Sequence, residues 1–550
     1  MRFALDSSVS PSRSSSAIPH ARHSPRVMLA AFALAAACAL AGCASGPNAL
    51  PSPSASSAPA LPPDTVSLFA IEHYDQNVDH VIDPASASYD TPFLTPEVQR
   101  AQFAALVARY FGDGPSDPSP WNRAYVEQRV YRNGGSDIAA LQTRRIALFD
   151  NADKAPRRVG YGMNFRPHTK AWIDAIASNM NVAQFERAPA YDASRRAIAT
   201  SALYVRELPT IDPSFYSHRI AGEGYPFDNL QVSAVRPGTP LYVLGTSADG
   251  AWRYVQTPDV QGWVRAEGVA RADNAFVAAW RAAVKQSLGV VVVASAAVRD
   301  DSGVFRFDAP AGSLLPLRAS TTGAATATNG VNGANEGSGA TGATREVVVP
   351  ARDIEGRAVI RTAPLDANAV VGGPLAATPR HLAMLMKALI GRPYGWGNAN
   401  FDNDCSAELQ SIFAAFGVWL PRHSSTQMSA GVMTDLSSST PAERLAWLAQ
   451  HGAPMRTLIY IGGHVMLYLG NTERDGHAVP LVYQDVWGLR PADNSRRAVI
   501  GGSVVLPLLL SYPEDPSLQS LAATPTFQVS ILGTPAGAAP SHDDEENPAG

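Results

Sequence analysis

Apolar positions in the second half of the chain predict an amphipathic helix that begins at Cys405. They recur at the three- and four-residue spacing of one buried face, and Gly417 stands where a helix commonly stops. The face consists of Leu409, Ile412, Phe413 and Phe416. The preceding stretch, 393–403, has too many Pro and Gly residues for a helix or strand and predicts an aromatic loop.

Two apolar runs after this helix predict buried strands. Residues 457–470 are too short for a typical helix of their own, and Gly462 and Gly463 divide the run into two strands. His464 then stands at the start of the second strand. A further run, 480–488, predicts the next strand.

The pattern changes twice in the first two thirds of the chain. Between residues 65 and 197 it is mostly helical, and a helix at 95–111 has Thr as its N-cap and Pro at its first position. From 198 to 273, short strands alternate with Pro, Gly and Asp-Gly turns. A second strand-rich stretch, 288–362, is interrupted at 319–344 by residues with too few apolar side chains to pack, which predicts a disordered insert.

These changes predict several domains and the α+β class. A signal peptide at 1–43 and a Pro/Ser/Ala-rich, disordered linker at 44–64 precede the helical domain. Two small β-barrels follow, and then a domain at 378–510 that holds the helix described first. The hydrophobic periodicity ends there, so residues 511–550 predict a disordered acidic tail.

Cys405 is the candidate nucleophile. In the first turn of a helix, its thiol would lie beside unpaired backbone N–H groups and the positive end of the helix dipole, which favour the thiolate. The alternative is a small core residue, the commonest role of a free cysteine. The position of Cys405 before the apolar face and after Asp402, Asn403 and Asp404 favours the reactive role.

A thiolate needs a base, and His464 is the candidate. The strand pattern alone fits equally well a histidine whose ring is satisfied within the core. A third polar group would orient the imidazole, and Gln484, Asp485 and His477 are the candidates. Gln484 and Asp485 point to opposite faces of an alternating strand, so only one of them can turn towards His464.

Four motifs together resemble those of the NlpC/p60 family of papain-like cysteine peptidases. In chain order they are Tyr394-Gly-Trp-Gly, Asp404-Cys405-Ser406, Gly463-His464-Val465 and Val486-Trp-Gly-Leu489. The resemblance implies a papain-like catalytic domain. It also implies cleavage of amide bonds in bacterial cell-wall peptides, typically between D-glutamate and a diamino acid.

Carried over position by position, the resemblance implies Cys405 as nucleophile, His464 as base and Gln484 as third residue, where relatives often have His. It further implies three substrate-binding residues: Tyr394, Asp404 and Ser406. In relatives the first packs beside the nucleophile, and the other two hold the free amine of the substrate's first residue. No metal or organic cofactor is implied. The stretches 198–273 and 288–362 are similar to bacterial SH3-like barrels, and the helical domain to the N-terminal stabilising region of some NlpC/p60 enzymes.

The start of the chain predicts an exported lipoprotein. The apolar run 28–40 has the length of a signal peptide and is too short to span a membrane. Leu40-Ala-Gly-Cys43 resembles a bacterial lipobox, which implies lipidation of Cys43; a plain signal peptide is the alternative. Ala44 is compatible with sorting to the outer membrane of a Gram-negative bacterium. We therefore expect a lipid anchor in the cell envelope, on the periplasmic face of that membrane.

The net charge and the cysteine content exclude some classes of partner and bound group. A net charge of −4 gives no basic field for nucleic acid. With Cys38 removed and Cys43 lipidated, Cys405 would be the remaining thiol, so neither an intramolecular disulfide nor a cysteine-based zinc site is expected. We expect a monomer that acts on peptidoglycan stem peptides. Two other functions stay open: a catalytically silent peptidoglycan-binding lipoprotein, and a Cys/His acyltransferase or amidase on the same fold.

Overall fold

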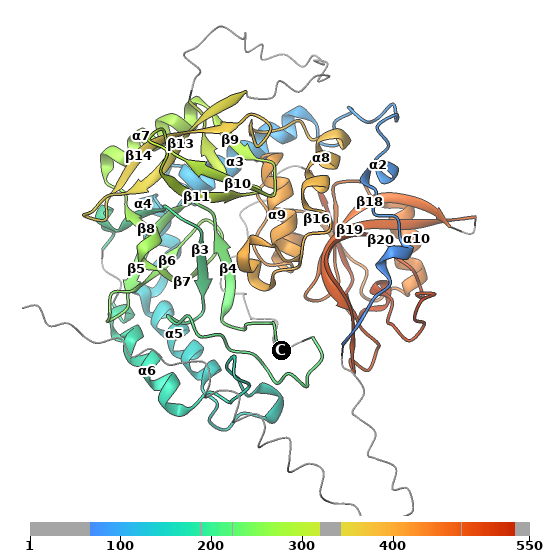
Figure 1. Ribbon diagram of the computed structural model, residues 1–550, viewed down its shortest axis with the longest axis horizontal. Coiled ribbons are helices and arrows are strands. Elements are labelled where there is room, and N and C mark those ends of the chain that lie inside the picture. The colour runs from blue at the N-terminus through green and yellow to red at the C-terminus, as the bar shows by residue number, and fades with distance from the viewer. Residues whose placement is uncertain (1–65, 188–189, 223, 319–342, 475, 534–550) are drawn as a thin grey trace, which may run out of the picture. The chain divides into compact units, whose positions relative to one another are not determined.

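The computed structural model of the protein (Figure 1) describes residues 66–187, 190–222, 224–318, 343–474 and 476–533. The predicted signal peptide, Cys43 and linker lie outside these residues, and so does most of the predicted insert. Within the described ranges, no helix has the length and apolar character needed to cross a membrane.

One seven-stranded sheet joins six strands from the C-terminal part of the described chain to β1 from its start, in the order β1-β20-β19-β18-β17-β21-β16. Figure 1 labels β16, β18, β19 and β20 of this sheet. Its strands are β1 (Val66–Leu68), β16 (Gly431–Asp435), β17 (Thr457–Tyr460), β18 (Val465–Arg474), β19 (His477–Leu489), β20 (Arg497–Pro507) and β21 (Gln528–Leu532). β1 runs parallel to β20, and the other neighbouring strands are antiparallel. The strands predicted at 457–470 and 480–488 are confirmed, with the turn at Gly462 and Gly463, where both φ angles are positive.

Helices cover both faces of this sheet. α8 (Pro379–Leu389) and α9 (Cys405–Ala415) share one core with the sheet residues Val465, Leu467, Tyr483 and Val505. α10 (Pro441–His451) places Leu448 against the opposite face, which carries Met466, Tyr468 and Val482. α9 begins at Cys405 as predicted, because the side chain of Asp404 caps it by accepting from the backbone N–H of Ala407.

A second seven-stranded sheet precedes this domain, with order β4-β3-β7-β6-β5-β2-β8. Its strands are β2 (Arg196–Ala199), β3 (Leu203–Arg206), β4 (Gln231–Val235), β5 (Pro240–Thr246), β6 (Trp252–Gln256), β7 (Gln261–Arg265) and β8 (Val269–Arg271). Alternating residues enclose a core that includes Leu241, Val255 and Val264. β4 was not among the predicted strands, and it becomes important because it faces the candidate site.

A smaller set of strands follows helix α7 (Asn274–Gln286), which the sequence analysis did not predict. β9 (Leu288–Val291) lies between β12 (Leu314–Pro316) and β15 (Val370–Gly372). Two hairpins complete the set: β10 (Ser295–Arg299) with β11 (Phe305–Pro310), and β13 (Thr344–Arg352) with β14 (Ala358–Asp366). These strands enclose a core that includes Val298, Phe307 and Val349.

The helical N-terminal region divides between two cores. α3 (Pro96–Phe111) packs on the C-terminal domain, where Gln99 Nε2 donates to the Phe416 carbonyl at 2.9 Å. α5 (Ser136–Phe149) and α6 (Lys170–Met180) pack on the sheet of strands β2 to β8, which is called the first barrel below. There Trp263 Nε1 donates to Gln142 Oε1 at 2.9 Å. The short helices α2 (Val78–Val81) and α4 (Arg123–Tyr125) complete the region.

The prediction of a disordered tail that starts at residue 511 is wrong for residues 511–533. β21 lies between β17 and β16 and pairs with both, and Phe527 and Val529 are fully buried. A five-residue strand separated from the rest by Pro-rich sequence is too short to show a convincing periodicity. Its order comes from pairing on two sides, which the linear sequence does not display.

Candidate active site

The candidate nucleophile lies where β18 and β19 part. Their ladder runs from Arg474 opposite His477 to Leu467 opposite Tyr483, and it stops before the start of β18. Cys405, the first residue of α9, reaches this end of β18, where the backbone N–H of Val465 donates a hydrogen bond to its sulfur. His464 directly precedes Val465, so the backbone of the candidate base lies close to the thiol.

His464 is oriented by Gln484. His464 Nε2 lies 2.7 Å from Gln484 Oε1, and Gln484 is 1% exposed. An amide oxygen only accepts, so Nε2 carries the proton and Nδ1 is the basic nitrogen. Of the three orienting residues that the sequence left open, Gln484 is the one that contacts His464.

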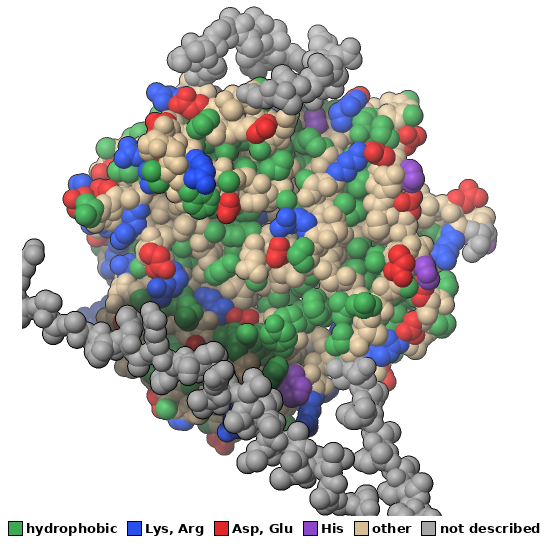
Figure 2. Space-filling model, viewed as in Figure 1, with side chains coloured by type: hydrophobic (Ala, Val, Ile, Leu, Met, Phe, Trp, Pro, Cys, Tyr) green, Lys and Arg blue, Asp and Glu red, His purple; other side chains and the backbone are tan. Residues whose placement is uncertain are grey.

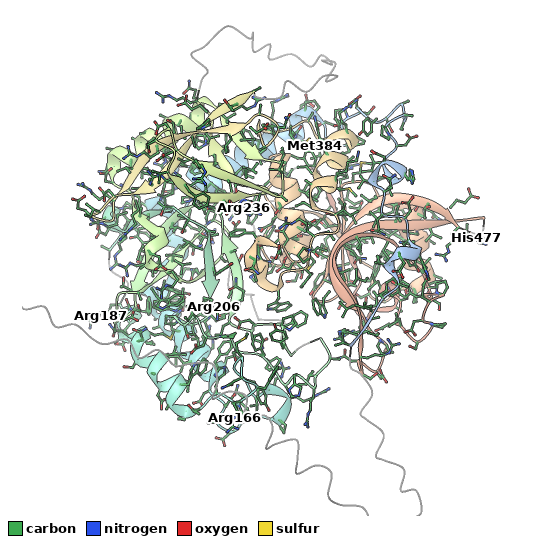
Figure 3. The ribbon with its side chains drawn as sticks, in the orientation of Figure 1. Arg166, Arg187, Arg206, Arg236, Met384 and His477 are labelled. Carbon is green, nitrogen blue, oxygen red and sulfur yellow. The ribbon has the colours of Figure 1, made fainter. Side chains whose placement is uncertain are left out.

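The other two candidates lie elsewhere. His477 is an exposed residue at the outer end of the β18–β19 hairpin, and Figure 3 shows it at the tip, remote from the labelled Arg236. Asp485 is fully buried, and neither of its carboxyl oxygens has a hydrogen-bond partner among the described residues. The acidic groups nearby do not form a metal site: the described chain has no cluster of three or more His, Cys, Asp or Glu suited to hold an ion.

Burial leaves Cys405 and His464 as a neutral pair. It raises the pKa of the Cys405 thiol to about 12, and the nearby carboxylate of Asp404 adds to the rise. Burial also lowers the pKa of His464 to about 4, against the effect of its hydrogen bond to Gln484. The resting site therefore departs from our expectation that the helix start favours thiolate, because desolvation outweighs the stabilising N–H of Val465.

A buried arginine engages Asp404 and Ser406, which the resemblance assigned to the substrate amine. Arg422 Nη2 lies 2.6 Å from Asp404 Oδ2, and Arg422 Nη1 donates to Asp404 Oδ1 at 3.1 Å and to Ser406 Oγ at 2.7 Å. Although burial opposes it, this guanidinium holds the pKa of Asp404 below its usual value. Both residues are thus held within the protein. The sequence analysis did not identify Arg422. It could have been sought as the cation that a buried Asp404 requires.

The first barrel contacts this site through β4 and the loop before it. The hydrogen bonds that cross the boundary include Arg422 Nε to Ser233 Oγ at 2.8 Å, Gln231 Nε2 to the Gly397 carbonyl at 3.1 Å, and Trp396 Nε1 to the Asp228 carbonyl at 3.1 Å. Arg236, labelled in Figure 3, follows β4 and donates to Ser411 Oγ of α9 at 2.6 Å. The barrel therefore holds both the loop before Cys405 and the helix that carries it.

An aromatic cluster lies at the same boundary. Phe227 contacts Trp396 and Trp487 edge-on, with ring centroids 5.1 Å apart in each pair. Trp487 lies 6.2 Å from Tyr394, measured between ring centroids. Burial raises the pKa of Tyr394 well above its usual value, and the charges of Cys405 and Asp404 add to the rise. Figure 2 shows a band of hydrophobic side chains over this region, between β4 and the strands β19 and β20.

Three segments match known families. Residues 391–487 match the NlpC/P60 family, residues 213–265 match an SH3 domain of the SH3b1 type, and residues 273–322 match an SH3 domain of the SH3b2 type. The chain thus contains an NlpC/P60 domain preceded by two SH3 domains, as the sequence motifs predicted.

Among the known proteins that are similar to this chain are a curated peptidase and a solved endopeptidase structure. The gamma-D-glutamyl-L-lysine dipeptidyl-peptidase of Bacillus cereus (strain ATCC 10987 / NRS 248) is 29% identical over 98 residues. The match covers 17% of this chain and spans 29% of the length of that relative. The solved structure of an NlpC/P60 endopeptidase from Photobacterium damselae subsp. piscicida is 25% identical, with a TM-score of 0.67. It covers 84% of this chain and 98% of the solved one, so the similarity includes the regions before the NlpC/P60 domain.

Proposed function

We propose that the protein is a cysteine peptidase that cleaves the stem peptides of peptidoglycan. The observation that carries the proposal is the placement of Cys405, His464 and Gln484. A thiol at the start of α9, a histidine next to Val465, whose backbone N–H contacts that thiol, and an amide oxygen 2.7 Å from His464 Nε2 are the parts that thiol catalysis needs. The NlpC/P60 domain supports this, and the names of both similar proteins describe peptidases.

The reaction follows from these three residues. His464 Nδ1 accepts the proton of Cys405 as the sulfur bonds to the substrate carbonyl carbon, and backbone N–H groups at the start of α9, including that of Cys405, stabilise the oxyanion. His464 then gives the proton to the leaving amine as the carbon–nitrogen bond breaks. Water, deprotonated by His464, cleaves the resulting thioester. Burial, which raises the pKa of the Cys405 thiol and lowers that of His464, favours the neutral pair before substrate binds.

The bond we propose is the one between D-glutamate and the following diamino acid. The name of the Bacillus cereus relative, a gamma-D-glutamyl-L-lysine dipeptidyl-peptidase, supports this choice. Tyr394 and the aromatic rings of Phe227, Trp396 and Trp487 would form a wall of the substrate site.

We also propose that lipid on Cys43 anchors the protein to the periplasmic face of the outer membrane. The support is the sequence Leu40-Ala-Gly-Cys43 at the end of an apolar run. Cys43→Ser should abolish labelling by a radioactive fatty acid and move the protein out of the membrane fraction. Unchanged labelling would contradict the anchor.

Mass spectrometry of muropeptides tests the proposed activity. Purified sacculus is digested with the full chain and, as a matched control, with its Cys405→Ala variant. We expect fragments cut after D-glutamate with the first protein and none with the second. Binding to sacculus without any released fragment would favour a silent binding protein, and modification of a lipid amide or ester would favour the acyltransferase or amidase.

A further inference from the structure

Asp485 is a buried carboxyl group in the candidate active-site region that has no assigned role. It lies on β19, opposite Ser503 of β20, and its neighbour Gln484 is the residue that orients His464. The side chain has no exposed surface, and neither oxygen finds a hydrogen-bond partner among the described residues. The proposed mechanism does not use it.

Most of the charged groups around Asp485 are negative, and the arginines near it are paired with other carboxylates. The carboxylates that face it are Glu408 of α9, Asp404 at the cap of α9 and Asp402 in the loop before the cap. Arg392 faces it too, but the Nη2 atom of this arginine is paired with Asp402 at 2.9 Å. Arg422, which is buried, is paired with Asp404.

Glu408, in contrast, is well satisfied. It accepts hydrogen bonds from Ser503 Oγ at 2.9 Å, from Asn403 Nδ2 at 2.5 Å and from the hydroxyl of Tyr483. Glu408 and Asp485 are therefore two buried carboxyl groups, and these hydrogen-bond donors all bind Glu408. An ionised carboxylate without a partner is far more costly to bury than a neutral acid. Burial accordingly raises the pKa of Asp485 well above its usual value, and Glu408 adds to the rise.

Asp485 also acts on the nucleophile. Glu408, whose partner Ser503 stands opposite Asp485, lies one helical turn after Cys405 on α9. Tyr483, on the same face of β19 as Asp485, shares a core with Cys405. In keeping with this placement, the charge of Asp485 adds to the rise in the pKa of Cys405. We propose that Asp485 stays uncharged in the working enzyme, and that the ionisation of Asp485 and the ionisation of Cys405 exclude one another. The proposal rests on the proposed function only for the role of Cys405 as nucleophile.

The consequence is a limit to activity on the alkaline side. When Asp485 loses its proton, a fixed negative charge beside the thiol opposes the thiolate that attack requires. The enzyme would then work best below the pH at which Asp485 ionises. Asp485→Asn keeps the shape and the neutral state of the side chain, so it should leave the neutral range unchanged and remove the alkaline limit.

Site-resolved alkylation tests the coupling without any turnover of peptide. The full chain and its Asp485→Asn variant are treated with iodoacetamide between pH 6 and pH 10, and the peptide that contains Cys405 is quantified by mass spectrometry. We expect equal rates near pH 6, and a variant about tenfold or more faster by pH 10, since one pKa unit is tenfold in thiolate. A rate ratio that stays constant across this range overturns the proposal. Asp493→Asn, an exposed acid in a turn, is the matched control and should track the wild-type protein.

Unfolding gives a second measure. If Asp485 keeps its proton in the folded protein, only the unfolded chain releases that proton above about pH 4, the ordinary pKa of aspartate. The free energy of unfolding of the wild-type protein should then fall, relative to the Asp485→Asn variant, until the pH reaches the pKa of folded Asp485. The unfolding constant of the wild-type protein should rise about tenfold per pH unit against that of the variant between pH 5 and pH 7. Parallel curves would overturn the proposal.

A spectroscopic measure needs no variant. With carbon-13 in the side-chain carboxyl groups of aspartate, the infrared spectrum of the wild-type protein at pH 7 should show the band of a protonated acid. Its absence would overturn the proposal. None of the three measurements depends on peptidase activity, so a failure of the proposed function, seen as no muropeptide cleavage, is distinguishable from a failure of this inference.

Discussion

Arg422→Met should destabilise the protein by about 3–5 kcal/mol at pH 7, because it removes one partner of a buried ion pair. The side chain of Arg422 is 4% exposed and that of Asp404 is 10% exposed. The guanidinium donates two hydrogen bonds to Asp404 and one each to Ser406 and Ser233. Methionine fills similar space but leaves the carboxylate of Asp404 buried and unpaired beside Cys405.

The pH dependence of the stability lost in Arg422→Met identifies the cause of that loss. Arg422 holds the pKa of Asp404 below its usual value, so the pair contributes stability above that value, and the contribution is lost as pH falls through the folded pKa. Without Arg422, Asp404 takes up a proton more readily, so the deficit should be largest near pH 7 and shrink towards pH 4. The double variant with Asp404→Asn should recover much of the loss, since Asn also caps a helix.

Urea unfolding of the full chain at pH 7 and pH 5 measures both effects. Ser233→Ala is the matched control, because it removes one contact of Arg422 without unpairing Asp404; its cost should be about 1 kcal/mol. A deficit below about 1 kcal/mol for Arg422→Met would place the pair among weak surface ion pairs and refute the reasoning. Failure of Asp404→Asn to restore stability would refute the proposed cause.

Three further predictions concern the site. Gln484→Ala should lower kcat about tenfold to a thousandfold, because Gln484 orients the imidazole without contributing a charge, whereas Gln484→His should retain activity. Steady-state cleavage of muropeptides measures both variants. A loss in Gln484→Ala as large as that in His464→Ala would contradict this prediction. Burial lowers the pKa of folded His464 to about 4, whereas the unfolded residue takes up a proton near pH 6.5. The free energy of unfolding should therefore fall by up to about 3 kcal/mol as the pH drops from 6.5 to 4. Urea unfolding of His464→Gln should show a weaker dependence on pH over this range. Phe227→Ala should raise KM more than it lowers kcat, since its ring lies at the wall of the site; equal KM values would exclude it from binding.

The sequence predicted the parts of the site that follow from local pattern. The start of α9 at Cys405, the turn at Gly462 and Gly463, and the strand of Gln484 all depend on spacing within a few residues. Alternation on that strand also predicted correctly that only one of Gln484 and Asp485 turns towards His464.

What the sequence could not predict depends on contacts between distant segments. Arg422 meets Ser233 across 189 positions of the chain, so no local pattern joins them. The charge state of Cys405 is a second case: a helix start favours thiolate, but the enclosure of the sulfur by β18 and the loop before α9 reverses the balance. Both depend on the fold, which decides which groups lose water and which gain partners.

Truncation at the end of the NlpC/P60 domain predicted from sequence should unfold that domain. Removing residues after Leu510 deletes β21, which pairs with β17 on one side and β16 on the other, and β17 leads directly to the turn before His464. It also removes Phe527, Val529 and Leu532, each at most 1% exposed. At about 1.5–3 kcal/mol for each buried side chain, their loss alone is about 5–9 kcal/mol, comparable to the total stability of a domain.

A chain that ends at Gly533 is the matched control, because it keeps every described residue. Circular dichroism on heating and alkylation of Cys405 under native conditions measure the outcome. We expect the longer chain to melt as the full protein does, and the shorter one to show no cooperative transition and rapid alkylation of a now exposed thiol. If the chain that ends at Leu510 melts cooperatively and cleaves muropeptides, β21 is dispensable, and the sheet that presents His464 is stable without its neighbour.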